Sequence, residues 1–308
     1  VYLKSQPEKF GLWVKVLEKA DVYNTLNINT IYTLFAPVNE GVERYLKKMN
    51  LTSVDQMTKE DANYLVRYHL IPNISIDLGQ FQSGAISDLN ATDDNLFVEF
   101  KEGGLDQIYL NGVSRFNAFD VKVTNGIIHG IDDVLEPLTA TILDRLKDGK
   151  YGIFYGLATA TGYDEQLNTV YTTGTDPDGN PIQQRFRYTA FAVSDDVYLK
   201  EGIHTLAELL NKLGASGSDL KSSDNPANRY MAYHLLAQQR SFADLGKFPA
   251  GATKMNLETM AQYELIKISE GGDGLVINAT GDAGSAIQFN EINIPCKNGV
   301  IHEVDSWM

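Results

Sequence analysis

The chain has 308 residues, of which 43% are hydrophobic, and it carries a formal net charge of −14 and one cysteine. This length predicts about two domains, each large enough to bury its own core. The negative charge excludes nucleic acid and anionic membrane surfaces as expected partners, and Cys296 alone can form neither an intrachain disulfide nor a multi-cysteine metal site.

The first predicted elements are helices with a short strand between them. The strand is expected at residues 33–36, and Asn39 is expected to cap the helix that follows. Thr58 is expected to cap the next helix, and Asn225, followed by a proline, to cap its counterpart in the second half. Apolar side chains at i, i+3, i+4 and i+7 predict the first helix from Phe10, Trp13, Val14 and Leu17. Its counterpart in the second half is expected at Ile153, Phe154, Leu157 and Ala158, which also lie on one helical face.

A Tyr-His pair ends the later helix of each half. In Tyr68-His69 and Tyr233-His234, helical spacing places the histidine on the apolar stripe and the tyrosine about 100° round the helix. A histidine on such a stripe is more often a hydrogen-bonded core residue than an open catalytic base. We therefore interpret His69 and His234 as half-buried side chains that tie helix to sheet, and the Tyr-His edges as candidate contact surfaces.

Period-two alternation follows the helices in each half. It predicts strands at residues 96–101, 107–111, 120–124 and 127–131, and again at 263–268, 275–278, 286–290 and 300–304. Helices followed by strands predict an α+β fold with mostly antiparallel pairing. Asn125-Gly126 and Asn298-Gly299 precede the last strands, and both turn residues are expected to take positive φ in a tight hairpin. His129 and His302, in those strands, are interpreted as packed side chains.

Three landmarks occur twice in the same order. The box at residues 35–39 returns at 191–195, the Tyr-His pair returns, and the Asn-Gly segment returns, at offsets of 156, 165 and 173 residues. Such ordered repetition predicts a duplicated domain with longer loops in the second copy. The predicted domains are residues 1–137 and 138–308.

The second copy has an additional segment at residues 168–187. Two strand-like runs flank a polar stretch that contains Asp176, Asp178 and Asn180, which predicts a hairpin with a long tip standing off the domain surface. The tip superficially resembles a calcium loop. It lacks the alternating third ligand and the distal glutamate, so we interpret it as a turn without metal.

The landmarks resemble the fasciclin-like adhesion domain. The resemblance rests on Phe35-Ala36-Pro37-Val38-Asn39, on Tyr68-His69 and on residues 125–137, and it covers essentially the whole chain as two tandem copies. It implies a wedge of two β-sheets with an N-terminal helical cluster, and adhesion without catalysis. It also implies receptor contact by the Tyr-His segments and by an Asp-Ile motif, which corresponds to Asp120-Val121. The second copy has Asn293-Ile294 there and lacks the charge.

The expected function is a non-catalytic binding module that recognises an extracellular protein or a polysaccharide as a monomer, without cofactor or metal. No run reaches the roughly 18 apolar residues of a membrane span, and no signal-peptide pattern opens the chain. We therefore expect any signal peptide to have been removed, and membrane contact to come only from a lipid anchor outside this chain. The resemblance implies an extracellular or cell-surface location, and tandem copies in bacterial surface lipoproteins add an outer-membrane-anchored or periplasmic setting.

Two alternative functions stay open. One is a carbohydrate-processing enzyme, which needs two convergent carboxylates; the sequence shows no nucleophile elbow, phosphate loop or dinucleotide fingerprint. The other is a purely structural spacer. Asp132 and Asp305 each follow a strand histidine by three residues, and an odd offset on a strand places them on the opposite face, which argues against a His-Asp metal site.

Overall fold

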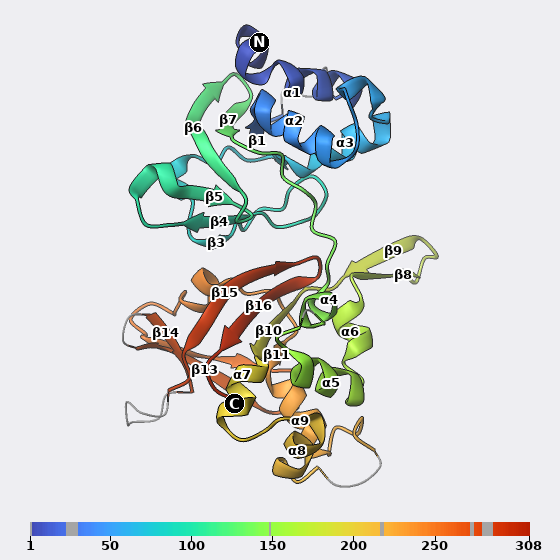
Figure 1. The fold of residues 1–308 in the computed structure, drawn as a ribbon, viewed down its shortest axis with the longest axis vertical. Coiled ribbons are helices and arrows are strands. Elements are labelled where there is room, and N and C mark those ends of the chain that lie inside the picture. Colours follow the sequence, from blue (N-terminus) through green and yellow to red (C-terminus); the bar gives the residue numbers. More distant parts are fainter. Residues whose placement is uncertain (1, 23–29, 148, 216–218, 272–273, 279–285) are drawn as a thin grey trace. The chain divides into compact units, whose positions relative to one another are not determined.

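The computed structural model describes residues 2–22, 30–147, 149–215, 219–271, 274–278 and 286–308. The chain divides into two compact units, residues 1–137 and residues 138–308 (Figure 1). Each unit combines helices with mostly antiparallel strands, which confirms the predicted α+β class. Within the described ranges, no helix is both long enough and apolar enough to cross a membrane.

The first unit packs three helices beside a seven-stranded sheet with the strand order β2-β1-β7-β6-β5-β4-β3 (Figure 1). The helices are α1 (Pro7–Lys19), α2 (Asn39–Lys48) and α3 (Lys59–Tyr68), with single 3-10 turns at Leu3–Ser5, Val54–Gln56, Leu78–Gln80 and Gly104–Gln107. The strands are β1 (Tyr32–Pro37), β2 (Leu70–Pro72), β3 (Gly84–Ala85), β4 (Phe97–Phe100), β5 (Ile108–Leu110), β6 (Ser114–Val123) and β7 (Gly126–Ile131).

The second unit repeats this plan with more helices and with its strands in separate sheets. Four strands follow the order β11-β10-β16-β15, three follow β12-β13-β14, and β8 and β9 form a separate pair. The helices are α4 (Ile142–Leu146), α5 (Gly152–Ala160), α6 (Asp164–Asn168), α7 (Asp195–Lys200), α8 (Leu206–Lys212), α9 (Pro226–Tyr233) and α10 (Phe242–Leu245). The strands are β8 (Tyr171–Thr175), β9 (Pro181–Arg185), β10 (Tyr188–Val193), β11 (Leu235–Leu236), β12 (Lys254–Glu258), β13 (Leu265–Gly271), β14 (Gly274–Ile277), β15 (Phe289–Cys296) and β16 (Gly299–Val304).

The apolar stripes predicted from the sequence form the helical part of each core. All eight stripe residues of α1 and α5 are buried, and each large side chain buried in this way contributes roughly 1.5–3 kcal/mol to folding. The predicted caps at Thr58 and Asn225 are confirmed, since their side chains accept hydrogen bonds from the backbone N–H groups of Asp61 and Ala227. Cys296 is buried, as expected for a small apolar side chain.

Asn39 does not cap α2, contrary to the prediction. It is the first residue of that helix, and its side chain reaches α1 instead: Oδ1 accepts from the N–H of Leu12 at 2.8 Å, and Nδ2 donates to the carbonyl oxygens of Pro7 and Glu8. Asp195 in the second unit likewise accepts from the N–H groups of Gly152 and Ile153 at the start of α5. The repeated box therefore fixes α1 to α2 in the first unit and α5 to α7 in the second.

The parallel pairing of β1 with β7, and of β10 with β16, explains why each Asn-Gly segment contains a glycine. Gly126 begins β7 and has φ +141°; a Cβ added there would lie 1.8 Å from the carbonyl oxygen of Tyr32. Gly299 has φ +152°, and its added Cβ would lie 2.0 Å from the carbonyl oxygen of Tyr188. The turn residues between the paired strand ends are 124–125 and 297–298, and neither Asn125 nor Asn298 has positive φ. The hairpins were predicted correctly, but the asparagine conformations were not.

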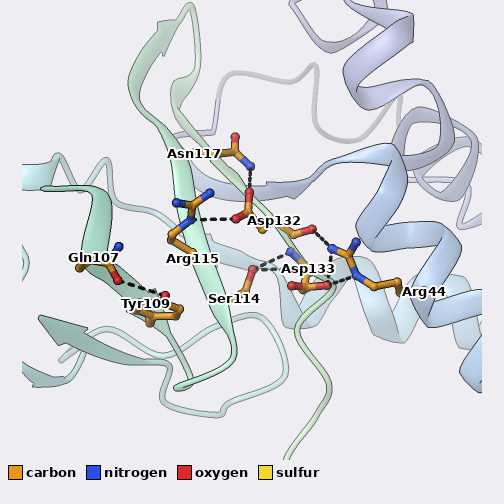
Figure 2. Close-up of polar contacts among 8 residues, drawn as sticks. All are labelled: Arg44, Gln107, Tyr109, Ser114, Arg115, Asn117, Asp132 and Asp133. Carbon is orange, nitrogen blue, oxygen red and sulfur yellow. Dashed lines mark hydrogen bonds and ion pairs between the residues drawn. The ribbon is translucent and has the colours of Figure 1, made fainter. Parts of the chain in front are cut away.

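A polar network at the end of β7 joins the sheet to α2 (Figure 2). The carboxylate of Asp132 accepts from Nε of Arg115 at 2.9 Å and from Nδ2 of Asn117 at 2.8 Å. Arg44 from α2 donates to the carboxylate of Asp133 and to the carbonyl oxygen of Asp132. Asp132 is therefore engaged by β6 rather than by His129, as its odd strand offset predicted.

Candidate binding surfaces

The Tyr-His histidines bind backbone with both ring nitrogens. Nδ1–H of His69 donates to the carbonyl oxygen of Leu65 at 2.8 Å, and Nε2 accepts from the N–H of Leu135 at 2.8 Å. His234 repeats this arrangement with Tyr230 and with Met308. Both imidazoles are fully buried rather than half-buried, because an aromatic ring of α1 or α5 covers each one: Trp13 at 4.7 Å and Phe154 at 5.5 Å between ring centroids.

The strand histidines use the opposite tautomer. Nε2–H of His129 donates to the carbonyl oxygen of Ile76 at 2.9 Å, while Nδ1 accepts from the N–H of Asp120 at 3.4 Å. His302 makes the same two contacts with Arg240 and Asn293. Each ring also stacks on a phenylalanine of the neighbouring parallel strand, Phe35 of β1 or Phe191 of β10. The four imidazoles therefore hold loop and terminal backbone against the sheet.

All four histidines are held neutral. Burial lowers the pKa of His69, His234 and His302 to about 4, although the hydrogen bond to a carbonyl oxygen opposes the shift. Burial also lowers the pKa of His129. A neutral imidazole with both nitrogens occupied by backbone has no free nitrogen for a metal ion or a substrate.

The tyrosines of the two Tyr-His pairs do not form the exposed edge that the sequence suggested. Tyr68 is 0% exposed, and its hydroxyl accepts from Nδ2 of Asn111 at 3.2 Å. Tyr233 is partly buried; its hydroxyl accepts from Nδ2 of Asn278 and donates to the carbonyl oxygen of Leu265. Asn111 and Asn278 both have positive φ near 50° and anchor a strand through Oδ1. In the folded domain, Tyr68 and His69 are therefore inaccessible to a partner.

Asp120 and Asn293 occupy matching bulges in β6 and β15. Both have positive φ, +52° and +57°, and the Oδ1 of each accepts from a backbone N–H at 2.8 Å, that of Leu78 or of Phe242. An amide oxygen makes this bond as well as a carboxylate does, which explains why the second copy can lose the charge. Val121, next to Asp120, is partly buried against the helical core. The Asp-Ile motif thus has a structural role in both units.

The Asp120 assignment predicts an asymmetry between two substitutions. Asp120→Asn should leave the free energy of unfolding of the first unit within about 0.5 kcal/mol, because the acceptor oxygen and the tolerance of positive φ are retained. Asp120→Ala should cost roughly 1–3 kcal/mol, because the N–H of Leu78 loses its acceptor. Urea unfolding followed by tryptophan fluorescence measures both values. If Asp120→Asn abolished ligand binding at unchanged stability, the carboxylate would be a contact residue after all.

The hairpin of β8 and β9 is the exposed feature that the sequence located. The two strands pair antiparallel over five residues each, from Tyr171 opposite Arg185 to Thr175 opposite Pro181, and they extend from the second unit as a ribbon (Figure 1). At the tip, Oδ1 of Asp176 accepts from the N–H groups of Asp178 and Asn180, and Oδ2 accepts from Nδ2 of Asn180. The tip is a turn, as predicted, and the carboxylate of Asp176 is hydrogen-bonded within the tip itself.

A second exposed feature was not predicted. Tyr263, in the turn before β13, is 93% exposed and has φ +63°, and Leu265 beside it is also exposed. Asp93 takes the same conformation in the first unit, with φ +60°. A tyrosine is an unusual residue for this backbone region, which Asn and Asp tolerate better. The sequence gives no turn signal at Tyr263 from which this exposure could be inferred.

No group of histidine, cysteine and acidic side chains suited to a metal ion occurs among the described residues. The carboxylates of Glu291 and Glu303 converge on one ammonium group, and both accept from Nζ of Lys150 at 2.7 Å. Burial would raise the pKa of Glu303, but hydrogen bonds from Lys150 and Tyr151 outweigh it and hold the pKa below its ordinary value. A glycosidase needs one carboxyl group whose pKa is raised, and Glu303, with its lowered pKa, does not fit that role.

The Fasciclin domain family matches residues 8–137 and 149–308, which is most of each unit. The chain belongs to the fasciclin domain family. Among relatives, Protein sll1483 of Synechocystis is 28% identical over 130 residues, covering 42% of this chain and 68% of that protein. Human periostin is 27% identical over 143 residues, which are 46% of this chain but only 16% of periostin. The pig transforming growth factor-beta-induced protein ig-h3 is 29% identical over 129 residues, 42% of this chain and 18% of that protein.

A solved structure of a fasciclin domain pair, from the insect cell adhesion molecule Fasciclin I, aligns along 97% of this chain and 95% of its own. The identity is 19% and the TM-score is 0.41. The two tandem fasciclin domains that the sequence indicated are thus confirmed by the family match, while the chain spans only a small part of the animal relatives it resembles.

Proposed function

We propose that the two fasciclin domains form a non-catalytic adhesion module, located at the cell surface or outside the cell, that binds a protein or a polysaccharide. Fasciclin domains are generally non-catalytic adhesion domains, and the family match covers both units. This location includes attachment of the module to an outer membrane through a lipid anchor outside this chain, and it includes the periplasm. The proposal assigns recognition to exposed segments, because the histidines and Tyr68 are committed to the core.

The β8–β9 hairpin is the observation that carries the proposal. It is an insertion into the second unit, and every residue of β8 is exposed. An isolated two-stranded ribbon is at best marginally stable in water, and its side chains contribute little to the core beneath. A segment whose first strand is exposed throughout, and whose tip is ordered by its own hydrogen bonds, is well suited to contact a partner.

The test replaces residues 171–185 with an Asn-Gly turn. Because the N–H of Phe186 donates to the carbonyl oxygen of Val170 at 2.9 Å, a two-residue turn can join these residues directly. We expect binding to arrays of glycans and immobilised extracellular-matrix proteins to fall at least about tenfold, or 1.4 kcal/mol. The free energy of unfolding should change by less than about 2 kcal/mol, because β8 is exposed throughout and the replacement removes the hydrogen bond from Arg185 to the carbonyl oxygen of Lys297.

Tyr263→Asn is the matched control for this replacement. It removes the most exposed aromatic ring of the same unit while keeping a residue that tolerates positive φ. Loss of binding in the hairpin replacement but not in Tyr263→Asn supports recognition by the hairpin. Full binding after the hairpin is replaced refutes it, and absence of any ligand for the intact chain favours the alternative of a structural spacer.

A further inference from the structure

The backbone hydrogen bonds of the hairpin show which groups of β8 face outward. The N–H of Phe186 donates to the carbonyl oxygen of Val170, and the N–H of Asp176 donates to that of Asn180, both at 2.9 Å. Hydrogen-bonded and non-hydrogen-bonded pairs alternate along an antiparallel ladder. Residues 172 and 174 therefore bond to β9, and Tyr171, Thr173 and Thr175 direct their N–H and C=O groups away from it. Among the described residues, no third strand joins this pair.

The outer edge of β8 lacks the features by which proteins usually protect an exposed strand. Its sequence, Tyr-Thr-Thr-Gly-Thr, contains no charge and no proline, and its register with β9 runs through five pairs without a bulge. β9 is protected at both ends, because Pro181 lacks an N–H and Arg185 is charged. The hairpin thus has one edge that is open to another strand.

We propose that β8 pairs antiparallel with β8 of a second copy of this chain. The proposal rests on the proposed function, since it names the partner that the hairpin binds. The three outward residues are symmetric about Thr173, so Thr173 lies opposite Thr173 of the second copy, and Tyr171 lies opposite Thr175 of the second copy. Each such pair exchanges two N–H···O=C bonds. A two-fold axis through Thr173 makes the contact isologous and closed.

Side chains and charges also favour a second copy over an unrelated strand. Each Tyr171 lies across from a threonine, an aromatic and β-branched pair that stabilises neighbouring strands. The hairpin is acidic at its tip, with Asp176 and Asp178, and basic at the opposite end of β9, with Arg185. Antiparallel pairing places each acidic tip about two strand spacings, roughly 10 Å, from the basic end of the other hairpin. The dimer departs from the monomer expected from the sequence.

The contact is small, so the dimer is weak. Two short strands joined at one edge bury less than the roughly 1,200 Å² of a standard stable interface. We expect a dissociation constant between about 1 µM and 1 mM. Copies displayed on two surfaces would be held together by many such contacts, which raises the overall avidity without any new interface.

Cysteine cross-linking tests the register. Cys296 is the single native cysteine and is buried, so a cysteine introduced in β8 is the reactive one. Thr173→Cys should form a disulfide-linked dimer under mild oxidation, because its Cα lies about 5.5 Å from its symmetry mate, within disulfide range. Thr172→Cys is the control: it lies opposite Gly174 of the second copy, on the other face. Equal cross-linking of both variants overturns the proposed pairing.

Sedimentation velocity tests the affinity. Between about 1 µM and 1 mM the wild-type chain should pass from monomer to dimer. Thr173→Lys places like charges opposite each other at the two-fold axis and should weaken the dimer at least about tenfold, whereas Thr172→Lys adds the same charge and should change it little. A wild-type chain that stays monomeric at the highest concentration refutes the proposal.

The outcomes separate this proposal from the proposed function. If no dimer forms but replacing the hairpin still abolishes binding to the arrays, the hairpin binds a different molecule and the self-pairing alone is refuted. If the dimer forms while array binding survives replacement of the hairpin, the self-pairing stands, and the hairpin is not the site of ligand recognition.

Discussion

Replacing Gly126 with alanine should lower the free energy of unfolding of the first unit by at least about 4 kcal/mol, in the range reserved for severe steric conflicts. The added Cβ would lie 1.8 Å from the carbonyl oxygen of Tyr32 and 2.9 Å from its nitrogen, so the clash is with backbone that no side-chain rotation can relieve. Relief requires β1 and β7 to separate, and these parallel strands are both interior strands of the sheet, flanked by β2 and β6. Since single domains are stable by about 5–15 kcal/mol, this loss consumes much of the total.

Gly104→Ala in the same unit is the control that separates the cost of the steric clash from the cost of positive φ for a residue with a Cβ. Gly104 also has positive φ, +81°, but an added Cβ there meets no atom within 4 Å. Its substitution should therefore cost only about 1–2 kcal/mol, the penalty of the left-handed region for a residue with a Cβ. Chemical unfolding monitored through Trp13 measures both variants. If the two substitutions cost the same, the approach of β1 to β7 is not what requires glycine at position 126.

Gly126 also shows why a correct sequence pattern can have a different physical cause. The Asn-Gly signal placed a hairpin between the last two strands, and the hairpin is there. From the local pattern, glycine was expected because a tight turn needs positive φ at both of its residues. In the structure, glycine is needed because the parallel strand β1 passes close to position 126. β1 is some ninety residues away in sequence, so a five-residue window contains no information about it.

Elements that depend on local spacing were predictable. The apolar stripe of α1, the cap at Thr58 and the ribbon of β8 and β9 follow from residues within one or two turns of each other. Elements fixed by distant partners were displaced or missed. β15 runs over Phe289–Cys296, where the sequence indicated two shorter runs, residues 286–290 and 293–296. β12 was not predicted, because its alternation, Lys-Met-Asn-Leu-Glu, places only partly buried side chains inward.

The sequence predicted the structural role of the histidines in the two Tyr-His pairs, but it did not predict the burial of Tyr68. The histidines were assigned to the architecture because they lie on apolar stripes, and both ring nitrogens of each do bind backbone. Tyr68 was assigned to the surface because it lies off the stripe. It is buried all the same, since residues of β4 and β5, among them Val98 and Leu110, pack in one apolar cluster with it. A helical wheel describes one helix and contains no information about which elements pack on its flank.

The four buried histidines should make the chain acid-sensitive well above the pKa range of its carboxylates. The pKa values of His69, His234 and His302 fall to about 4 in the folded state, against an ordinary value near 6.5 when unfolded. Between these values the unfolded chain binds protons that the native chain does not, so stability falls as pH decreases below about 6.5. The loss approaches 1.4 kcal/mol per pH unit for each histidine.

The sign and the window of this effect distinguish it from carboxylate titration. At pH 5 each of these three histidines should cost about 2 kcal/mol relative to neutral pH. Asp244 and Glu303 have folded pKa values below their ordinary ones, so their contributions are lost only as pH falls through the carboxylate range beneath that window. A decline in stability between pH 6.5 and about 5 is therefore assigned to the imidazoles.

Each unit contains one tryptophan, Trp13 or Trp307, so the two units can be followed separately in urea unfolding across this pH range. Trp13→Phe silences the first unit and leaves Trp307 to report the second. In the wild type both units should lose stability between pH 7 and pH 5. His69→Ala should cost the first unit about 1–3 kcal/mol at neutral pH, because the N–H of Leu135 loses its acceptor, yet reduce its pH slope by one proton. The slope of the second unit should not change. A slope that is flat in the wild type, or unaltered in His69→Ala, would mean that these rings accept a proton inside the fold, and that burial does not lower their pKa.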